Sequence, residues 1–192
     1  MTLRLAQDEA ADALLDRDPF ALLVGMLLDQ QFPMERAFAG PQLLAERMGV
    51  DRLDPVEVAA RDPDAFTALM TGPPAVHRYP GSMGRRVQAL AAAVRDDYDA
   101  DAARIWTDAS SGAELLRRLR ALPGFGDQKA RIFVALLGKQ RGVTPPGWRE
   151  AAGAYGEEGS RRSVADVVDA RSLAEVREYK QLAKRAAADR SP

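Results

Sequence analysis

The stretch ALPGFGDQKARIFVALLG, residues 121–138, is the strongest constraint on how this chain can fold. Two apolar segments with helical spacing flank a five-residue segment at 122–126, which is too short for an ordinary loop. Its proline fixes one φ angle, and Gly124 and Gly126 permit positive φ, so the chain can reverse within a few residues. The pattern predicts a hairpin of two helices, the second capped by Asp127 and ended by Gly138.

Composition extends the helical expectation to all 192 residues. Hydrophobic residues make up 46% of the chain and aromatic residues only 6%, and alternating runs of valine, isoleucine and threonine are lacking. A sequence whose apolar residues are largely alanine favours helices over sheets. We therefore expect an all-α protein in one domain, residues 1–192.

Capping residues, prolines and glycines along the chain indicate where the other helices begin and end. The Asp-Pro pairs at Asp18, Asp54 and Asp62 each combine a capping residue with proline at the first helical position. The first of these helices, FALLVGMLLDQQ, is apolar on nearly every face and should lie in the core. Residues 72–84 contain three prolines and three glycines, which predicts a surface loop.

Several classes of protein are excluded or disfavoured by residue usage. The chain has no cysteine, which excludes disulfides, thiol catalysis and an iron–sulfur cluster. Its one histidine, His77, argues against a histidine-rich metal site. The longest apolar run, residues 20–28, is too short to span a bilayer, and the amino terminus lacks a secretion signal. We expect a cytoplasmic monomer with no membrane partner and no cofactor.

Charge is distributed unevenly around the hairpin. Although the net charge is −1, residues 113–142 hold seven basic and two acidic side chains. Such asymmetry indicates a surface for an anionic ligand. The alternative is that these arginines are ordinary solvated residues on helices.

The hairpin itself could bind phosphate. With no side chains at Gly124 and Gly126, backbone N–H groups would stand open at the positive end of the following helix. A phosphate oxygen could bind there directly or through a monovalent cation, while Phe125 points inward between the helices. The alternative is an ordinary tight turn between two helices, capped by glycine.

Two segments carry a family resemblance. LPGFGDQKARIFVALLG resembles the helix–hairpin–helix element of the HhH-GPD DNA glycosylases, the superfamily of endonuclease III, the adenine glycosylase and the alkyl-adenine glycosylases. DPFALLVGMLLDQQ resembles the first core helix of that superfamily, and the pair is similar to an actinobacterial-type subgroup. The resemblance spans about residues 18–150. It implies a two-lobed helical fold, with 30–138 as a barrel lobe ending in the hairpin and 1–29 plus 139–192 as the second lobe.

The resemblance also implies a function in base excision repair on double-stranded DNA, and thus association with the nucleoid. Such enzymes flip the target nucleotide into the cleft between the lobes. Gln31 would fill the gap that is left, and Ser82 or Met83 would act as a wedge. Met83 is favoured because apolar wedges separate stacked bases, with core packing as the alternative. The remaining DNA-contact positions are Leu122, Gly124, Phe125, Gly126, Gln128, Lys129 and Arg131.

The sequence departs from the family at its catalytic carboxylate. The family's aspartate is replaced by Thr144 in one alignment and falls near Trp148 in another, and Glu150 is the nearest acidic residue. Asp29, at the end of the core helix, is the candidate that could stabilise the cationic sugar or activate water. The alternatives are that Asp29 bonds the following turn or pairs with Arg36, and that Trp148 is a core residue rather than a platform for a base.

A second departure concerns the lysine that forms a Schiff base in bifunctional members. Its position is occupied by Gln128, and Lys129 is rotated by about 100° on the helix. We therefore expect a monofunctional DNA glycosylase without lyase activity. The alternatives are a non-catalytic protein that recognises damaged or abasic DNA, and a helical protein–protein module that only shares the hairpin.

Overall fold

Helix α2 (Pro19–Leu28) lies at the centre of the molecule because nine of its ten residues are buried. In this computed structural model, which describes residues 2–188, Asp18 caps α2 by accepting hydrogen bonds from the amides of Phe20 and Ala21. The second oxygen of Asp18 accepts the Leu53 amide at 2.7 Å. The capping residue therefore also attaches the loop before α4 to the start of the core helix.

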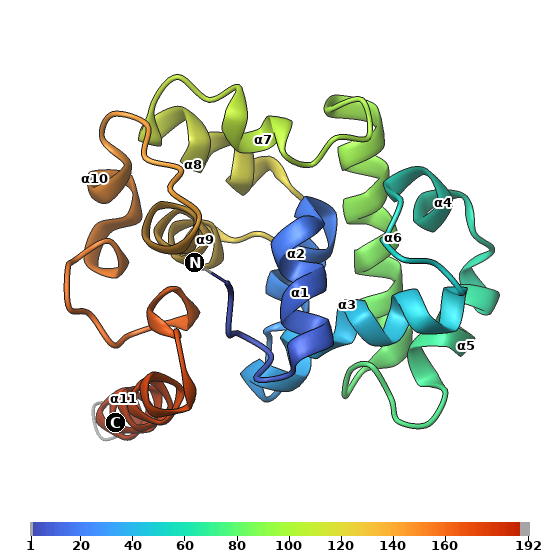
Figure 1. Ribbon diagram of the computed structural model, residues 1–192, viewed down its shortest axis with the longest axis horizontal. Coiled ribbons are helices and arrows are strands. Elements are labelled where there is room, and N and C mark those ends of the chain that lie inside the picture. Colours follow the sequence, from blue (N-terminus) through green and yellow to red (C-terminus); the bar gives the residue numbers. More distant parts are fainter. Residues whose placement is uncertain (1, 189–192) are drawn as a thin grey trace.

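The described chain is helical, and no strand occurs within residues 2–188 (Figure 1). This confirms the all-α expectation. The helices other than α2 are α1 (Glu9–Arg17), α3 (Met34–Met48), α4 (Pro55–Ala60), α5 (Pro63–Thr71), α6 (Pro80–Asp97), α7 (Arg104–Thr107), α8 (Gly112–Ala121), α9 (Asp127–Gln140), α10 (Trp148–Ala152), η1 (Gly153–Tyr155), η2 (Val164–Asp166) and α11 (Ala170–Ala188).

The helices pack in two groups along the chain. Helices α1 and α2 pack on α3, and α4 and α5 pack on α6, while α8, α9 and α10 pack against one another with η2 and α11 beside them (Figure 1). The contacts of α2 with α3 and α6 join helices on both sides of residue 30. The division into lobes at residues 30 and 138 stays a prediction.

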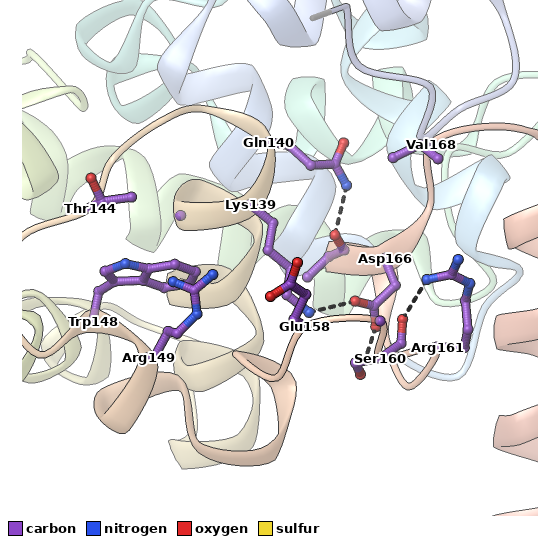
Figure 2. A pocket seen from close by; sticks show the side chains of 13 residues that line it. Lys139, Gln140, Thr144, Trp148, Arg149, Glu158, Ser160, Arg161, Asp166 and Val168 are labelled. Atoms are coloured by element: carbon purple, nitrogen blue, oxygen red, sulfur yellow. Dashed lines mark hydrogen bonds and ion pairs between the residues drawn. The ribbon is translucent and has the colours of Figure 1, made fainter.

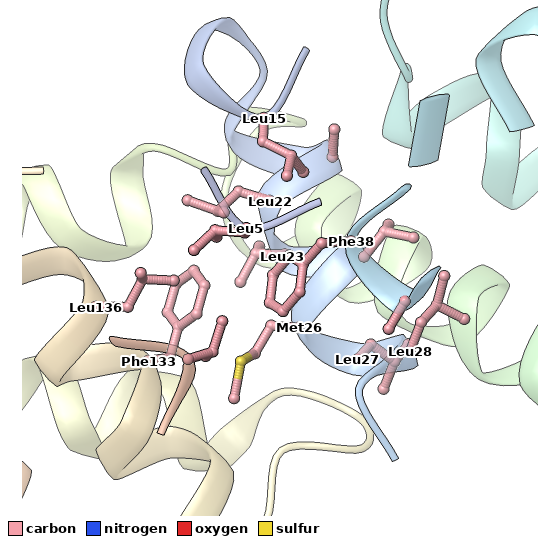
Figure 3. Close-up of a cluster of buried hydrophobic side chains, with 14 of the residues drawn as sticks. Leu5, Leu15, Leu22, Leu23, Met26, Leu27, Leu28, Phe38, Phe133 and Leu136 are labelled. Carbon is pink, nitrogen blue, oxygen red and sulfur yellow. The ribbon is translucent and has the colours of Figure 1, made fainter. Parts of the chain in front are cut away.

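One hydrophobic core runs through both groups. Figure 3 shows Leu5 and Met26 in one cluster with Phe133 and Leu136 of α9. Leu5 is fully buried although it precedes the first helix. The amino-terminal segment is therefore part of the core, where Leu5 packs in the cluster that α2 shares with α9.

Four helix boundaries differ from those expected. Helix α2 ends at Leu28, although the helical segment was expected to continue to Gln31. Helix α6 begins at Pro80, so the second half of the expected 72–84 loop is helical. Gly126, not Asp127, is the N-cap of α9, and α9 continues past Gly138 to Gln140. Gly138 has a packing role instead, because a Cβ there would overlap the Trp148 ring.

Candidate functional site

The hairpin between α8 and α9 is held by close packing on α2. The Phe125 amide donates to the Leu122 carbonyl at 3.1 Å, and Gly124 has a φ of +81°. A Cβ at Gly124 would overlap Cδ1 of Leu27, so both the backbone and the contact require glycine there. The Phe125 ring is 3% exposed and meets Phe133 edge-on at 5.9 Å, which confirms its inward direction.

The start of α9 is open to solvent. Gly126 has an ordinary φ of −69°, and a Cβ added there would meet no atom within 4 Å. No side chain caps α9, so the N–H groups of its first turn lack intrahelical partners. Open N–H donors suit direct contact with an anion, and the monovalent cation expected at the hairpin stays a prediction.

A cavity of about 460 Å³ lies where the end of α2, the hairpin and α11 meet. We call it the hairpin cavity. It brings together five of the site residues expected from sequence, which are Asp29, Gly124, Gly126, Gln128 and Lys129. The cavity is lined by Met26, Asp29, Gln30, Gly124, Gly126, Asp127, Gln128, Lys129, Ile132 and Lys180.

Lys129 binds the protein backbone. Its Nζ donates to the carbonyl oxygens of Met26 and Leu27, both at 2.8 Å, and so satisfies the open end of α2. Burial lowers the pKa of Lys129 to about 8, and the charge of Asp29 opposes that shift. The expected phosphate contact at Lys129 is thus corrected: its ammonium group is held at the end of α2 and is not extended into solvent.

Asp29 is the C-cap residue of α2, and its side chain is 13% exposed. Its carboxylate lies 3.8 Å from Nζ of Lys180 on α11. The alternative in which Asp29 pairs with Arg36 is wrong, because the Arg36 guanidinium lies over the Phe32 ring at 4.8 Å. Sequence reasoning missed Lys180, which lies 151 positions along the chain from Asp29 in a helix with many charged residues.

Gln128 and Arg131 connect α9 to the segment around α10. Gln128 Nε2 donates to Oη of Tyr155 at 2.9 Å, and Arg131 donates to Asp127 at 2.9 Å and to the Ala151 carbonyl at 2.8 Å. The local sequence carried no signal for Tyr155, because the contact depends on how α10 returns along α9. Gln128 remains exposed at the cavity, whereas Arg131 is used in packing.

Most of the basic residues around the hairpin have internal partners. Arg118, for example, bonds Glu114 at 2.6 Å and the carbonyls of Arg104 and Asp108. Arg117 is the most open of the paired arginines, with a side chain 73% exposed. Those with acidic partners are Arg117, Arg118, Arg120, Arg131, Lys139 and Arg141. Most of the basic residues around the hairpin are therefore ordinary helix-surface residues paired within the protein.

Gln31, Ser82 and Met83 line one cavity of about 180 Å³. Gln31 is exposed and has a φ of +53°, and Ser82 is exposed on the first turn of α6. Met83 is 3% exposed and packs in the core. The expectation of an exposed apolar wedge at Met83 is wrong, because the register of α6 turns this side chain inward.

The positions aligned with the family's aspartate line a different cavity, of about 370 Å³, shown in Figure 2. Trp148 is buried against Gly138, with the Arg149 guanidinium 4.4 Å from its ring centroid. Trp148 is therefore a core residue and not an open platform for a base. Thr144 and Glu150 are exposed, and this cavity shares no lining residue with the hairpin cavity.

A buried ion pair lines the cavity of about 370 Å³. Lys139 Nζ lies 2.6 Å from Asp166, whose other oxygen accepts the Ser160 hydroxyl at 3.2 Å (Figure 2). That oxygen also accepts the amide of Arg162 at 2.9 Å. Every partner belongs to the chain. The arrangement joins α9 to the η2 segment.

Comparison of the chain with family models, with curated proteins and with solved structures found no match. Among residues 2–188, no three histidine, aspartate or glutamate side chains gather as a metal site would require. Nor does the described part of the chain contain a helix of the length and apolar character needed to cross a membrane.

Proposed function

We propose that this chain binds double-stranded DNA through the hairpin and removes a damaged base as a monofunctional DNA glycosylase in base excision repair. The observation that carries the proposal is the hairpin cavity, which sets Asp29 and Gln128 directly beside an open helix N-terminus. Its volume of about 460 Å³ is within the range of small-ligand pockets. The resemblance of residues 121–138 and 18–31 to the HhH-GPD superfamily supports the same function.

In this proposal the amides at the start of α9 hold a phosphate of the DNA backbone, which positions the duplex without reading its sequence. The extruded nucleotide enters the hairpin cavity. Asp29 lies at the cavity wall, where its carboxylate stabilises the cationic sugar or accepts a proton from the attacking water. Lys129 already donates to two carbonyls and is not needed as a nucleophile.

A non-catalytic protein that binds damaged or abasic sites is the second candidate. It is favoured by one observation, which is that Thr144 and Trp148, at the positions of the family's aspartate, provide no carboxylate and line a cavity apart from the hairpin. Both candidates require the hairpin to bind DNA.

The catalytic proposal is tested by base release from duplexes that carry uracil, hypoxanthine, alkylated or oxidised bases, with alkali added afterwards to cleave the abasic product. We expect release from at least one duplex, no cleavage before alkali, and a loss of at least about a hundredfold in rate for Asp29→Asn. Asp127→Asn is the matched control, because it removes one carboxylate from the same cavity at a residue already paired with Arg120 and Arg131. Full activity in Asp29→Asn would remove Asp29 from the mechanism, and no release from any duplex would favour the second candidate.

DNA binding is tested separately with Gly126→Val. The fold leaves open space at this position, so we expect helix content to be retained while the β-branched side chain covers the amides that would meet the phosphate. Affinity for duplex DNA at low salt should fall at least about tenfold. Unchanged affinity would show that the hairpin does not bind phosphate.

A further inference from the structure

His77, the chain's single histidine, joins two turns on the face next to the hairpin cavity. Its ring is 1% exposed. The Tyr79 amide donates to Nδ1 at 3.0 Å, and Nε2 lies 3.1 Å from the Gln30 carbonyl. Because Nδ1 accepts, the proton is on Nε2, which donates to Gln30, so both bonds require the neutral Nε2–H tautomer.

The two turns carry residues of the proposed DNA surface. One contains Gln31, which has a φ of +53°, and the other contains Tyr79, which is 45% exposed, and leads directly into Ser82. His77 lies between two cavities, of about 180 and 340 Å³, and Gln31 and His77 line both. The ring also packs on Phe32, with centroids 4.7 Å apart. The position of Gln31 relative to Tyr79 is therefore set through one imidazole.

We propose that His77 is a positioning residue for DNA binding: its neutral ring holds the Gln31 turn against the Tyr79 turn, and protonation of Nδ1 separates them and weakens binding. A protonated Nδ1 is a donor that faces the Tyr79 N–H, so that hydrogen bond is lost. This inference rests on the proposed DNA binding and deepens it, because it makes the same surface sensitive to pH.

The surroundings of the ring resist protonation under ordinary conditions. Burial lowers the pKa of His77 below its usual 6.5, the cations Lys129 of α9 and Arg86 of α6 lower it further, and the carbonyls of Gln30 and Leu28 oppose the shift. Two further cations, Arg78 over the Tyr79 ring and Arg36 over the Phe32 ring, line the cavity of about 340 Å³. The lowered pKa of His77 favours the neutral ring, and with it the joined state, at neutral pH.

The direction in which DNA affinity changes with pH distinguishes this positioning role from a direct attraction between His77 and the phosphates. A histidine that only adds positive charge strengthens DNA binding as the pH falls, because it adds an attraction to phosphate. Loss of the hydrogen bond to Tyr79 predicts the opposite. By linkage, DNA binding must then lower the pKa of His77, although the phosphates alone would raise it.

The test is fluorescence anisotropy of the full chain with a duplex containing one abasic site, at constant ionic strength between about pH 5 and 7.5, where histidine is the side chain that normally titrates. We expect affinity to fall about fivefold to tenfold as His77 protonates. His77→Asn keeps an acceptor for the Tyr79 amide without titrating in this window, so its affinity should not change with pH. Affinity that is constant or rises on acidification in the wild-type chain would overturn the inference.

Nitrogen-15 NMR of the same chain gives a second measurement that does not depend on DNA. The single histidine should show an unprotonated Nδ1 at neutral pH, and the amide signals of Gln31 and Tyr79 should shift together as it titrates. An Nδ1–H tautomer, or titration without those shifts, would overturn the role of His77 even if DNA binds. A correct tautomer with no DNA binding at any pH would instead overturn the proposed function.

Discussion

The two ends of α9 each hold a lysine, and the two are bound in opposite ways. Near the carboxyl end, Lys139 meets the carboxylate of Asp166 in a network closed by Ser160 and backbone amides. At the amino end, Lys129 donates to two carbonyl oxygens and faces the hairpin cavity. The comparison teaches that a lysine paired with a buried carboxylate joins two segments of the chain. A lysine that meets only neutral carbonyls lies beside open space, and burial lowers its pKa.

The largest expected effect on stability is at the carboxyl end of α9, where Lys139 pairs with Asp166. Asp166→Ala leaves Lys139, whose side chain is only 17% exposed, without its partner, and removes the acceptor for the Ser160 hydroxyl and the Arg162 amide. We expect a loss of about 3–5 kcal/mol in the free energy of unfolding, measured by urea denaturation. A loss below about 1 kcal/mol would show that the pair is solvated and would break the comparison.

Gly124→Ala tests whether the hairpin before the amino end of α9 packs closely on α2. The new Cβ meets Leu27, and the residue must keep a φ of +81°, so we expect a loss of about 2–4 kcal/mol in the free energy of unfolding. Thermal and urea unfolding both report it. If the variant is as stable as the wild-type chain, the hairpin does not rest on α2 as described.

The titration of Lys129 sharpens the difference between the lysines. Its pKa is lowered to about 8, so between that pH and the ordinary 10.5 the unfolded chain binds more protons than the folded one. Stability contributed through this group therefore rises with pH across that window. The difference in the free energy of unfolding between the wild-type chain and Lys129→Met should change by about 1–3 kcal/mol from pH 8 to 10.5.

The comparison of the wild-type chain with Lys129→Met isolates this group, because the other titratable side chains are common to both proteins. Parallel curves for the wild-type chain and Lys129→Met would mean that Lys129 titrates like a surface lysine.

The smallest effect is expected at Gly126→Ala. Its φ of −69° suits alanine and its surroundings are empty, so stability should change by less than about 0.5 kcal/mol. The contrast with Gly124→Ala, two residues away, is measured in the same unfolding experiment. A large loss at Gly126 would indicate that the first turn of α9 is not open.

The fold was more predictable from sequence than the site. The capping residues Asp18 and Asp54 and the apolar sequence of α2 act locally, and the structure has them as expected. Met83 was misjudged because the expected loop ended at residue 84, whereas α6 begins five residues before position 85, at Pro80. Met83 is therefore helical and lies four residues before the buried Val87, on the face of α6 that meets the core.

The site residues that sequence reasoning missed depend on distant packing. Lys180 reaches Asp29 only because α11 returns past the end of α2, and His77 acts through the Gln30 carbonyl, 47 positions away. Neither carries a local pattern. Lys129 was placed correctly on the first turn of α9, but its binding of α2 carbonyls follows from the close approach at Gly124.

The amino-terminal segment has a consequence for the order of folding. Asp16 accepts the Leu3 amide and also binds Arg141, which lies 125 positions later in the chain. Contacts of such separation form late, after the loop between them has been closed. During synthesis, the buried Leu3 and Leu5 would therefore remain exposed until the end of α9 has left the ribosome, so these two leucines are covered long after they are made.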